Sequence, residues 1–314
     1  MSDNPVNSWF AWYNSAMNLP VLSPSAKAHI KVFLATLLIA GSFPASAHLA
    51  PVLHPLSLTL MRFFIALVAL SPFVLFDSRK RQSLKKLLPR ASLLGLFYAG
   101  FFVAMFEALK TTQVLNTASL YTLVPFVTAL LAWGIFKEPI KLKKIGVFAL
   151  GVFGTLWVIF EGDSTRVLEL SFYHGDKIFA FGALLMCFYS IGVQYFYRED
   201  NPIVLVYGTL VGGCMWMGVG LAVFNIPLEW HLIQGGLVFS MGYLAIGTTL
   251  LTLYLLQGAT VTLGSVRVMS YVYLNPAVVA FFLFATLGKT IPAVVLPGIV
   301  LSAIATLLLQ RSKI

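Results

Sequence analysis

The chain has 314 residues, of which 59% are apolar and 10% charged, against about 45–50% and about 25% in an ordinary soluble domain. This composition, with a mean hydropathy of +0.89, excludes a water-soluble globular fold, and the long unbroken apolar runs exclude an outer-membrane barrel, whose strands alternate. The net charge of +10 does not indicate nucleic-acid binding, because the basic residues form no single face and no base-reading module is present.

The apolar runs are each about 20 residues long, which is enough for a helix to cross a bilayer core of about 30 Å. They predict an all-α integral membrane protein with ten transmembrane helices. Residues 1–29 are expected to form a cytoplasmic or interfacial tail. In chain order, the predicted helices lie near 30–50, 55–76, 91–111, 115–136, 145–160, 177–197, 203–224, 236–257, 264–287 and 292–310.

The basic residues are concentrated in two short connections between these helices. The first connection contains Arg79, Lys80, Arg81, Lys85, Lys86 and Arg90, and the second contains Lys137, Lys141, Lys143 and Lys144. Short loops rich in Lys and Arg stay on the cytoplasmic side of a membrane. Both termini are therefore predicted to be cytoplasmic, and the acidic segment 161–176 to face outward, in a multi-pass protein of the bacterial inner membrane.

One competing interpretation concerns the first apolar run. Lys27, Lys31, the apolar segment 32–40 and the triplet 45–47 together imitate a secretory signal with its cleavage site. The run lies far from Met1, and its removal would leave an odd number of crossings. A retained membrane helix is therefore the favoured interpretation.

The chain repeats weakly but without gaps at an offset of 151 residues. Pro125 and Pro276 coincide at this offset, together with the pairs Ala108 and Ala259, Thr111 and Thr262, and Ser119 and Ser270. Five crossings in each half require the two copies to be inserted in opposite orientations. We therefore expect two inverted five-helix repeats, over residues 30–160 and 172–311, with a solute path between them.

The order and spacing of several residues resemble the drug/metabolite transporter superfamily, specifically its EamA-type exporters. The resemblance begins with Gly41, Pro55, Arg62 and Pro72, and continues in ALKTTQVLNTASLYTLVPFVTALLAWGIFKEPIKLKKIGVFALGVFGTLWVI and in HGDKIFAFGALLMCFYSIGVQYFYR. It implies ten helices, a central cavity shared by the two halves, and export or exchange of a small polar metabolite. The chain departs from the family in its long aromatic tail, and in having Lys289 where the first repeat has Glu138.

Ionisable residues within spans are costly and indicate candidate sites. Arg62 lies about eight residues into its helix, or about 12 Å deep at 1.5 Å per residue, and Glu107 lies near the same end of the next helix. The pair is predicted either to bind a zwitterionic substrate, with Glu107 also carrying protons, or to form a structural ion pair. Arg267 is predicted to contact substrate or to reach the interface with its long side chain.

Polar residues before the two matched prolines are the other candidates, since a proline frees a backbone carbonyl for a cavity. A purely architectural kink is the alternative. The aromatic residues Tyr98 and Tyr243 are predicted to line the cavity, although packing would explain them equally. The predicted substrate-binding residues beyond Arg62, Glu107 and Arg267 are Tyr98, Ser119, Tyr121, Tyr243, Tyr271 and Asn275.

Two classes of function are compatible with these features. The first is a secondary transporter, which is favoured by the predicted inverted repeat and by the absence of a Walker-type loop in the sequence; within this class, export of an amino acid or amine competes with uptake of a vitamin- or nucleotide-like metabolite. The second is a membrane-embedded enzyme. The five histidines show no HExxH spacing, there is no GxSxG motif, and Cys187 and Cys214 lack metal-type spacing. We therefore expect no catalysis, cofactor or metal, and the expected partners are a small-molecule substrate and membrane lipid, with the chain a monomer or a homodimer.

Overall fold

The computed structural model describes the chain except for residues 1–22, 138–141, 161, 164–171, 289–291 and 312–314. Most of the predicted tail therefore lies outside the described residues. Glu138, Lys141, Glu161, Lys289 and Lys313 also lie outside them.

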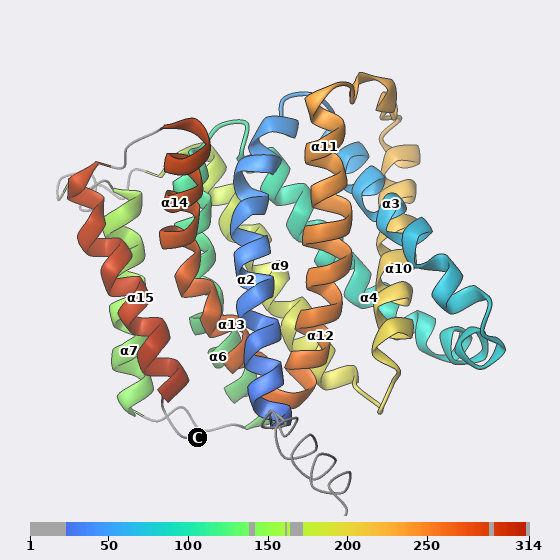
Figure 1. The fold of residues 1–314 in the computed structure, drawn as a ribbon, viewed down its shortest axis with the longest axis horizontal. Coiled ribbons are helices and arrows are strands. Elements are labelled where there is room, and N and C mark those ends of the chain that lie inside the picture. The colour runs from blue at the N-terminus through green and yellow to red at the C-terminus, as the bar shows by residue number, and fades with distance from the viewer. Residues whose placement is uncertain (1–22, 138–141, 161, 164–171, 289–291, 312–314) are drawn as a thin grey trace, which may run out of the picture.

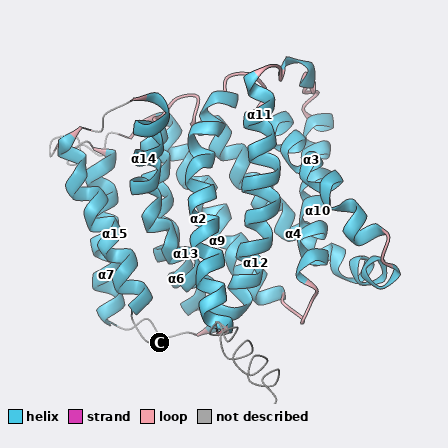
Figure 2. Ribbon diagram, viewed as in Figure 1, coloured by secondary structure: helices cyan, strands magenta, loops and turns pink. Residues whose placement is uncertain are grey.

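The described residues form helices joined by short turns, and they contain no strand (Figure 2). The first half comprises α2 (Pro24–Leu49), α3 (Pro55–Leu75), α4 (Ser78–Ala108), α5 (Val114–Leu120), the 3-10 turn η1 (Tyr121–Leu123), α6 (Val124–Phe136) and α7 (Leu142–Ile159). The second half comprises α9 (His174–Phe196), α10 (Pro202–Val223), η2 (Trp230–Leu232), α11 (Gly236–Gly242), η3 (Tyr243–Leu251), α12 (Thr252–Leu263), α13 (Ser265–Ser270), η4 (Tyr271–Leu274), α14 (Asn275–Leu287), η5 (Ala293–Val295) and α15 (Leu296–Arg311).

Within the part of the chain that the structure describes, eight helical segments are long and apolar enough to cross a membrane. Two shorter apolar segments, Ile145–Val158 and Ala293–Leu309, accompany them. The eight segments are Pro24–Leu49, Pro55–Leu75, Ser78–Ala108, Val114–Phe136, His174–Phe196, Pro202–Val223, Gly236–Leu263 and Ser265–Phe282. The prediction of an all-helical membrane protein is confirmed in this form.

Proline and a capping side chain define where three of these helices begin. Ser23, His54 and Asn201 each accept a hydrogen bond from a backbone N–H of the first turn, and a proline follows each of them. Proline suits this position because its missing N–H has no intrahelical partner there. Local sequence therefore determines these helix starts.

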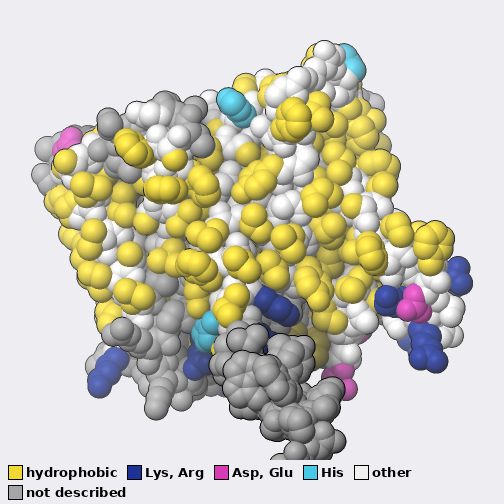
Figure 3. Space-filling view, viewed as in Figure 1, with side chains coloured by type: hydrophobic (Ala, Val, Ile, Leu, Met, Phe, Trp, Pro, Cys, Tyr) yellow, Lys and Arg dark blue, Asp and Glu magenta, His cyan; other side chains and the backbone are white. Residues whose placement is uncertain are grey.

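The first basic connection is helical, which the sequence analysis did not predict. The helix α4 begins at Ser78 rather than near residue 91, because Asp77 accepts from the N–H groups of Arg79 and Lys80 at 2.9 and 3.3 Å. The residues that follow are mostly Lys, Arg, Gln and Leu, which favour helix. Their charges stand out at the lower right of the molecule in Figure 3.

The long helices stand side by side and roughly parallel or antiparallel (Figure 1). Side chains on the visible face are mostly apolar, and Lys and Arg gather along its lower edge, where α2 begins (Figure 3). An apolar belt with a charged edge is the surface that a bilayer requires.

The two halves interlock by a set of exchanged contacts. The helix α4 of the first half packs on α9 of the second, and α2 packs correspondingly on α12. In the same way α9 contacts α6, and α2 contacts α14. In both of these pairs, the helix that the first half contributes to one contact corresponds in chain order to the helix that the second half contributes to the other.

The fourth helix of each half is interrupted at the same place. A 3-10 turn separates α5 from α6 just before Pro125, and another separates α13 from α14 just before Pro276. The turns η1 and η4 contact each other, while α5 packs against α14 and α6 against α13. The two interrupted helices therefore run antiparallel and meet at their interruptions.

Candidate functional site

The most unusual buried residue is Arg62, on α3, whose side chain is fully buried. Its Nη2 donates to the hydroxyl of Thr248 at 2.7 Å and to the Thr248 carbonyl at 3.1 Å, and its Nε donates to the hydroxyl of Thr249. Its Nη1 has no hydrogen-bond partner among the described residues. A buried cation with an unused donor is poised to bind an acceptor group.

The threonines that hold Arg62 belong to a π-helical segment, η3. The hydroxyls of Thr248 and Thr249 both donate to the carbonyl of Leu244, at 3.1 and 2.8 Å. The wider π-helical turn presents adjacent threonines, and one of their carbonyls, to the same guanidinium group. Such segments are rare and are frequent at functional sites.

Aromatic rings cover the other side of Arg62. Its guanidinium carbon lies 3.8 Å from the centre of the Phe102 ring, within the range of a cation–π interaction. Tyr98 packs edge-on against Phe102 with ring centres 4.9 Å apart, and its ring lies 4.7 Å from that of Tyr189. The cation therefore lies between hydroxyl acceptors from the second half and rings from the first.

A small cavity adjoins this arrangement, and its volume is about 20 Å³. A cavity of this size holds about one water molecule. It lies between the two halves, since its lining comes from α2, α4, η1, α9, η3 and α12. The lining residues are Ile39, Ser42, Tyr98, Phe101, Phe102, Tyr121, Met186, Thr248, Thr252 and Leu256.

Gln257, on α12, supplies a second polar group at the centre of the bundle. It is 2% exposed, and its Nε2 donates to the hydroxyls of Tyr189 at 3.1 Å and Thr209 at 3.4 Å. Its Oε1 has no partner in the described part of the chain. Gln257, Thr248 and Thr249 were not among the site residues predicted from the sequence, although the amide of Gln257 within an apolar span was a signal that could have identified it.

Four of the predicted site residues lie at this centre. Arg62, Tyr98 and Tyr121 are buried, and the Tyr121 ring stacks on Phe101 with centres 5.3 Å apart. Tyr243 begins η3, and its hydroxyl donates to the carbonyl of Leu38 on α2 at 2.8 Å. These residues come from four different transmembrane segments, so only the tertiary fold brings them together.

Two other predicted residues lie at the end of the bundle where α2 begins. Tyr271 is half-buried, and its hydroxyl shares a hydrogen bond of 2.9 Å with Nδ1 of His29. Arg267 is also half-buried and is close enough to His29 to interact with it electrostatically. This group is separate from the residues around Arg62.

Ser119 and Asn275 lie on the two interrupted helices and are fully buried. The Ser119 hydroxyl and both polar atoms of the Asn275 side chain have no partner within the described ranges. Since α5 packs on α14, both residues belong to the crossing of the interrupted helices.

Glu107 lies near the end of α4, away from the charge that it was expected to meet. Its carboxylate pairs with Lys110 at 2.8 Å, and its side chain is 43% exposed. The structure therefore forms a surface ion pair here instead of a pair with Arg62.

Comparison with known proteins shows which proteins the chain is similar to. Residues 26–160 match the EamA-like transporter family. The chain is 26% identical over 234 residues to the uncharacterized transporter YyaM of Bacillus subtilis (strain 168), covering 74% of this chain and 76% of that protein. A crystal structure of a protein that is 19% identical superposes with a TM-score of 0.67, covering 90% of this chain and 98% of its own, which shows a shared fold. The resemblance predicted from the motifs is confirmed as a match to the EamA-like transporter family over residues 26–160, in a chain with the apolar helices of a multi-pass membrane protein.

Proposed function

We propose that the protein is a secondary transporter that exports or exchanges a small polar metabolite, such as an amino acid or an amine, by alternating access. The observation that carries the proposal is the buried guanidinium of Arg62, which retains an unused N–H group between the two halves of the bundle. A cation buried in a membrane span is costly, and such residues usually face a solute path or pair with another group.

Two polar groups beside the cavity lining would suit a zwitterionic solute: Arg62 contacts the lining residues Thr248 and Phe102, and Gln257 donates to Tyr189. Arg62 offers a donor to a carboxylate, a charge-assisted hydrogen bond of the stronger kind, and the Gln257 Oε1 offers an acceptor to an ammonium group. The rings of Tyr98 and Tyr121 would pack on the apolar part of the solute. A polyanion such as a nucleotide sugar would need more cations than Arg62 and Arg267.

The remaining predicted residues take places along the same proposed path. Tyr243 and the pair Ser119 and Asn275 would contact the solute on either side of the cavity, and Arg267 with Tyr271 would contact it at the end where α2 begins. Glu107 is proposed to carry protons at the opposite end, where its exposed carboxylate can exchange with water.

The proposed mechanism requires two inverted five-helix repeats. The exchanged contacts between halves support this arrangement, as do the antiparallel interrupted helices with prolines at matched positions. The two shorter apolar helices would complete ten crossings. Because the cavity holds about one water molecule, loading a metabolite requires the halves to rock apart.

Both termini are proposed to be cytoplasmic in a bacterial inner membrane. The Lys and Arg side chains along the lower edge in Figure 3 support this orientation. Single cysteines at Pro51 and Arg198, in the corresponding first turns of the two halves, would be labelled from opposite sides of the membrane. Labelling from the same side would end the inverted-repeat proposal.

A ligand screen followed by flux measurement tests the function. Purified protein is heated with amino acids, amines and vitamins, since a ligand that binds the native state raises the apparent melting temperature. The best ligand is then loaded into proteoliposomes, and we expect counterflow of labelled solute that Arg62→Gln abolishes and Arg90→Gln preserves. Chemical conversion of the ligand would favour the membrane-enzyme alternative. Preference for a vitamin- or nucleotide-like ligand would favour the uptake alternative.

A further inference from the structure

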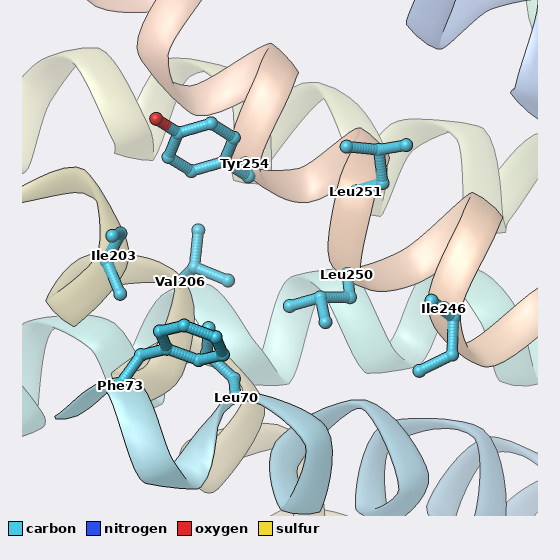
Figure 4. A pocket seen from close by; sticks show the side chains of 8 residues that line it. All are labelled: Leu70, Phe73, Ile203, Val206, Ile246, Leu250, Leu251 and Tyr254. Atoms are coloured by element: carbon cyan, nitrogen blue, oxygen red, sulfur yellow. The ribbon is translucent and has the colours of Figure 1, made fainter. Parts of the chain in front are cut away.

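A groove of about 370 Å³ lies on the side of the bundle, apart from the central cavity. Leu70 and Phe73 of α3 form one wall, Leu250 and Tyr254 of η3 and α12 form the opposite wall, and Val206 of α10 lies between them (Figure 4). Its volume falls within the roughly 300–1,000 Å³ that is typical of ligand sites. The groove is large enough for an extended apolar chain.

The groove is open at the outer surface of the bundle. Phe73 is 63% exposed and Tyr254 is 39% exposed, whereas Val206 is fully buried and forms the floor. The tyrosine hydroxyl is the only polar side-chain atom among the lining residues of this described groove (Figure 4). A lipid tail along this surface would meet one polar side-chain atom, the hydroxyl of Tyr254.

Two lysines contact Phe73 and Tyr254, lining residues that lie at the same end of the groove (Figure 4). Lys80 donates from Nζ to the carbonyl of Phe73 at 2.9 Å, so its charge is held at one wall. Lys31 holds its Nζ 5.9 Å from the ring centre of Tyr254, at the opposite wall. Asp77 faces Lys80 at 3.6 Å and neutralises part of its charge. A net positive charge remains where the apolar groove ends.

We propose that this groove binds an anionic phospholipid, with an acyl chain along Leu70, Val206 and Leu250 and the headgroup at the end where Phe73 and Tyr254 lie, attracted by Lys31 and Lys80. The position of the charges favours this occupant, because a phospholipid places its phosphate at the depth where basic side chains gather and its tail in the apolar belt. The proposal does not depend on the transported solute, since the groove is separate from the cavity beside Arg62.

Native mass spectrometry of the detergent-purified full chain tests the proposal. The protein is equilibrated with equal amounts of phosphatidylglycerol and phosphatidylcholine that carry identical acyl chains. Because each lysine near a membrane surface adds to the attraction of anionic lipid, we expect phosphatidylglycerol to be retained about tenfold more than phosphatidylcholine. The double variant Lys31→Gln/Lys80→Gln should bring the ratio close to one.

Two matched controls separate the groove from the general surface. Lys85→Gln removes an exposed charge from the same basic segment and should leave the ratio unchanged. Leu70→Trp fills the groove and should lower retention of both lipids, whereas Val68→Trp, at an exposed position of α3 outside the groove lining, should not. Each variant is first shown to elute as a monodisperse species.

Three results would overturn the proposal. They are equal retention of the two lipids by the unmodified chain, an effect of Lys85→Gln as large as that of the double variant, and unchanged retention after Leu70→Trp.

Discussion

Arg62 on α3 donates to the hydroxyl of Thr248 in η3, with Nη2 and Oγ1 2.7 Å apart. These residues are 186 positions apart in the chain, so one hydrogen bond joins the two halves at the wall of the cavity. A substrate carboxylate that binds Arg62 would alter this bond. Under the proposed function, this bond would couple solute binding at Arg62 to the packing between the halves.

Replacing Arg62 tests its role in binding. Arg62→Gln should weaken binding of the ligand found by the thermal screen by roughly ten- to a hundredfold, because a hydrogen bond to a charged group contributes about 1.5–3 kcal/mol. Isothermal titration checks this value. Arg90→Gln breaks a pair with Asp200 that lies 3.2 Å away near the surface, and it should leave the affinity unchanged. Equal affinities for the Arg62 variant and the unmodified chain would remove Arg62 from the binding site.

The proton-carrying role of Glu107 stays a prediction. Glu107→Gln removes the titrating carboxylate while keeping its size, so we expect flux driven by a pH gradient to be lost and solute exchange to persist. Proteoliposomes with and without a gradient measure both. Lys110→Gln, which removes only the partner of the ion pair, serves as the control. Unchanged gradient-driven flux in Glu107→Gln would exclude this residue from coupling.

The close approach of α4 and α10 depends on glycine. A methyl group added at Gly212 would lie 2.3 Å from Cα of Ser92, whereas one added at Gly218 of the same helix would meet nothing within 4 Å. Gly212→Ala should therefore lower stability by about 1–3 kcal/mol through overpacking, and Gly218→Ala should be neutral or mildly stabilising. Thermal unfolding in detergent compares the two variants. Equal melting temperatures would mean that the helices can separate at little cost.

His54 caps the start of α3, and we expect its titration to make this helix start sensitive to pH. Its Nδ1 accepts from the N–H of Leu56 at 3.2 Å, and burial, together with the charge of Lys110, lowers its pKa below 6.5 against the opposing effect of Glu107. A histidine with a lowered folded pKa stabilises the fold above its unfolded pKa, and this contribution is lost as the pH falls through both values.

His54→Asn should therefore flatten the fall in melting temperature between about pH 7 and pH 5, because asparagine also caps helices but does not titrate. The comparison is made in the same detergent with the unmodified chain. A melting temperature that falls as steeply in the variant would assign the pH dependence to other groups.

The helices were largely predictable from local sequence. The predicted span 55–76 corresponds to α3 at Pro55–Leu75, and the predicted span 203–224 corresponds to α10 at Pro202–Val223. Apolar length and proline at a helix start are local features, so these boundaries required no tertiary contact. The beginning of α4 was not predicted. The basic residues were used only to indicate the cytoplasmic side of the membrane, whereas the same segment is also helical.

The candidate site was only partly predictable. Arg62 and Tyr98 were recognised because a cation or a tyrosine hydroxyl within an apolar run is conspicuous. The expected neighbour of Arg62 was Glu107, a choice that rested on similar depth along two helices. Depth does not specify which faces of two helices meet. In the structure, Glu107 pairs with Lys110 instead.

The sequence by itself therefore determined that this is a helical membrane protein, where several of its helices begin, and which ionisable side chains within spans are candidates for a site. These properties depend on hydrophobic length and on local capping. Only the tertiary structure decided that Thr248, Thr249 and Phe102 surround Arg62 and that a π-helical turn presents the threonines. Hydrogen bonds between distant helices depend on the rotation and packing of each helix, which an apolar run does not encode.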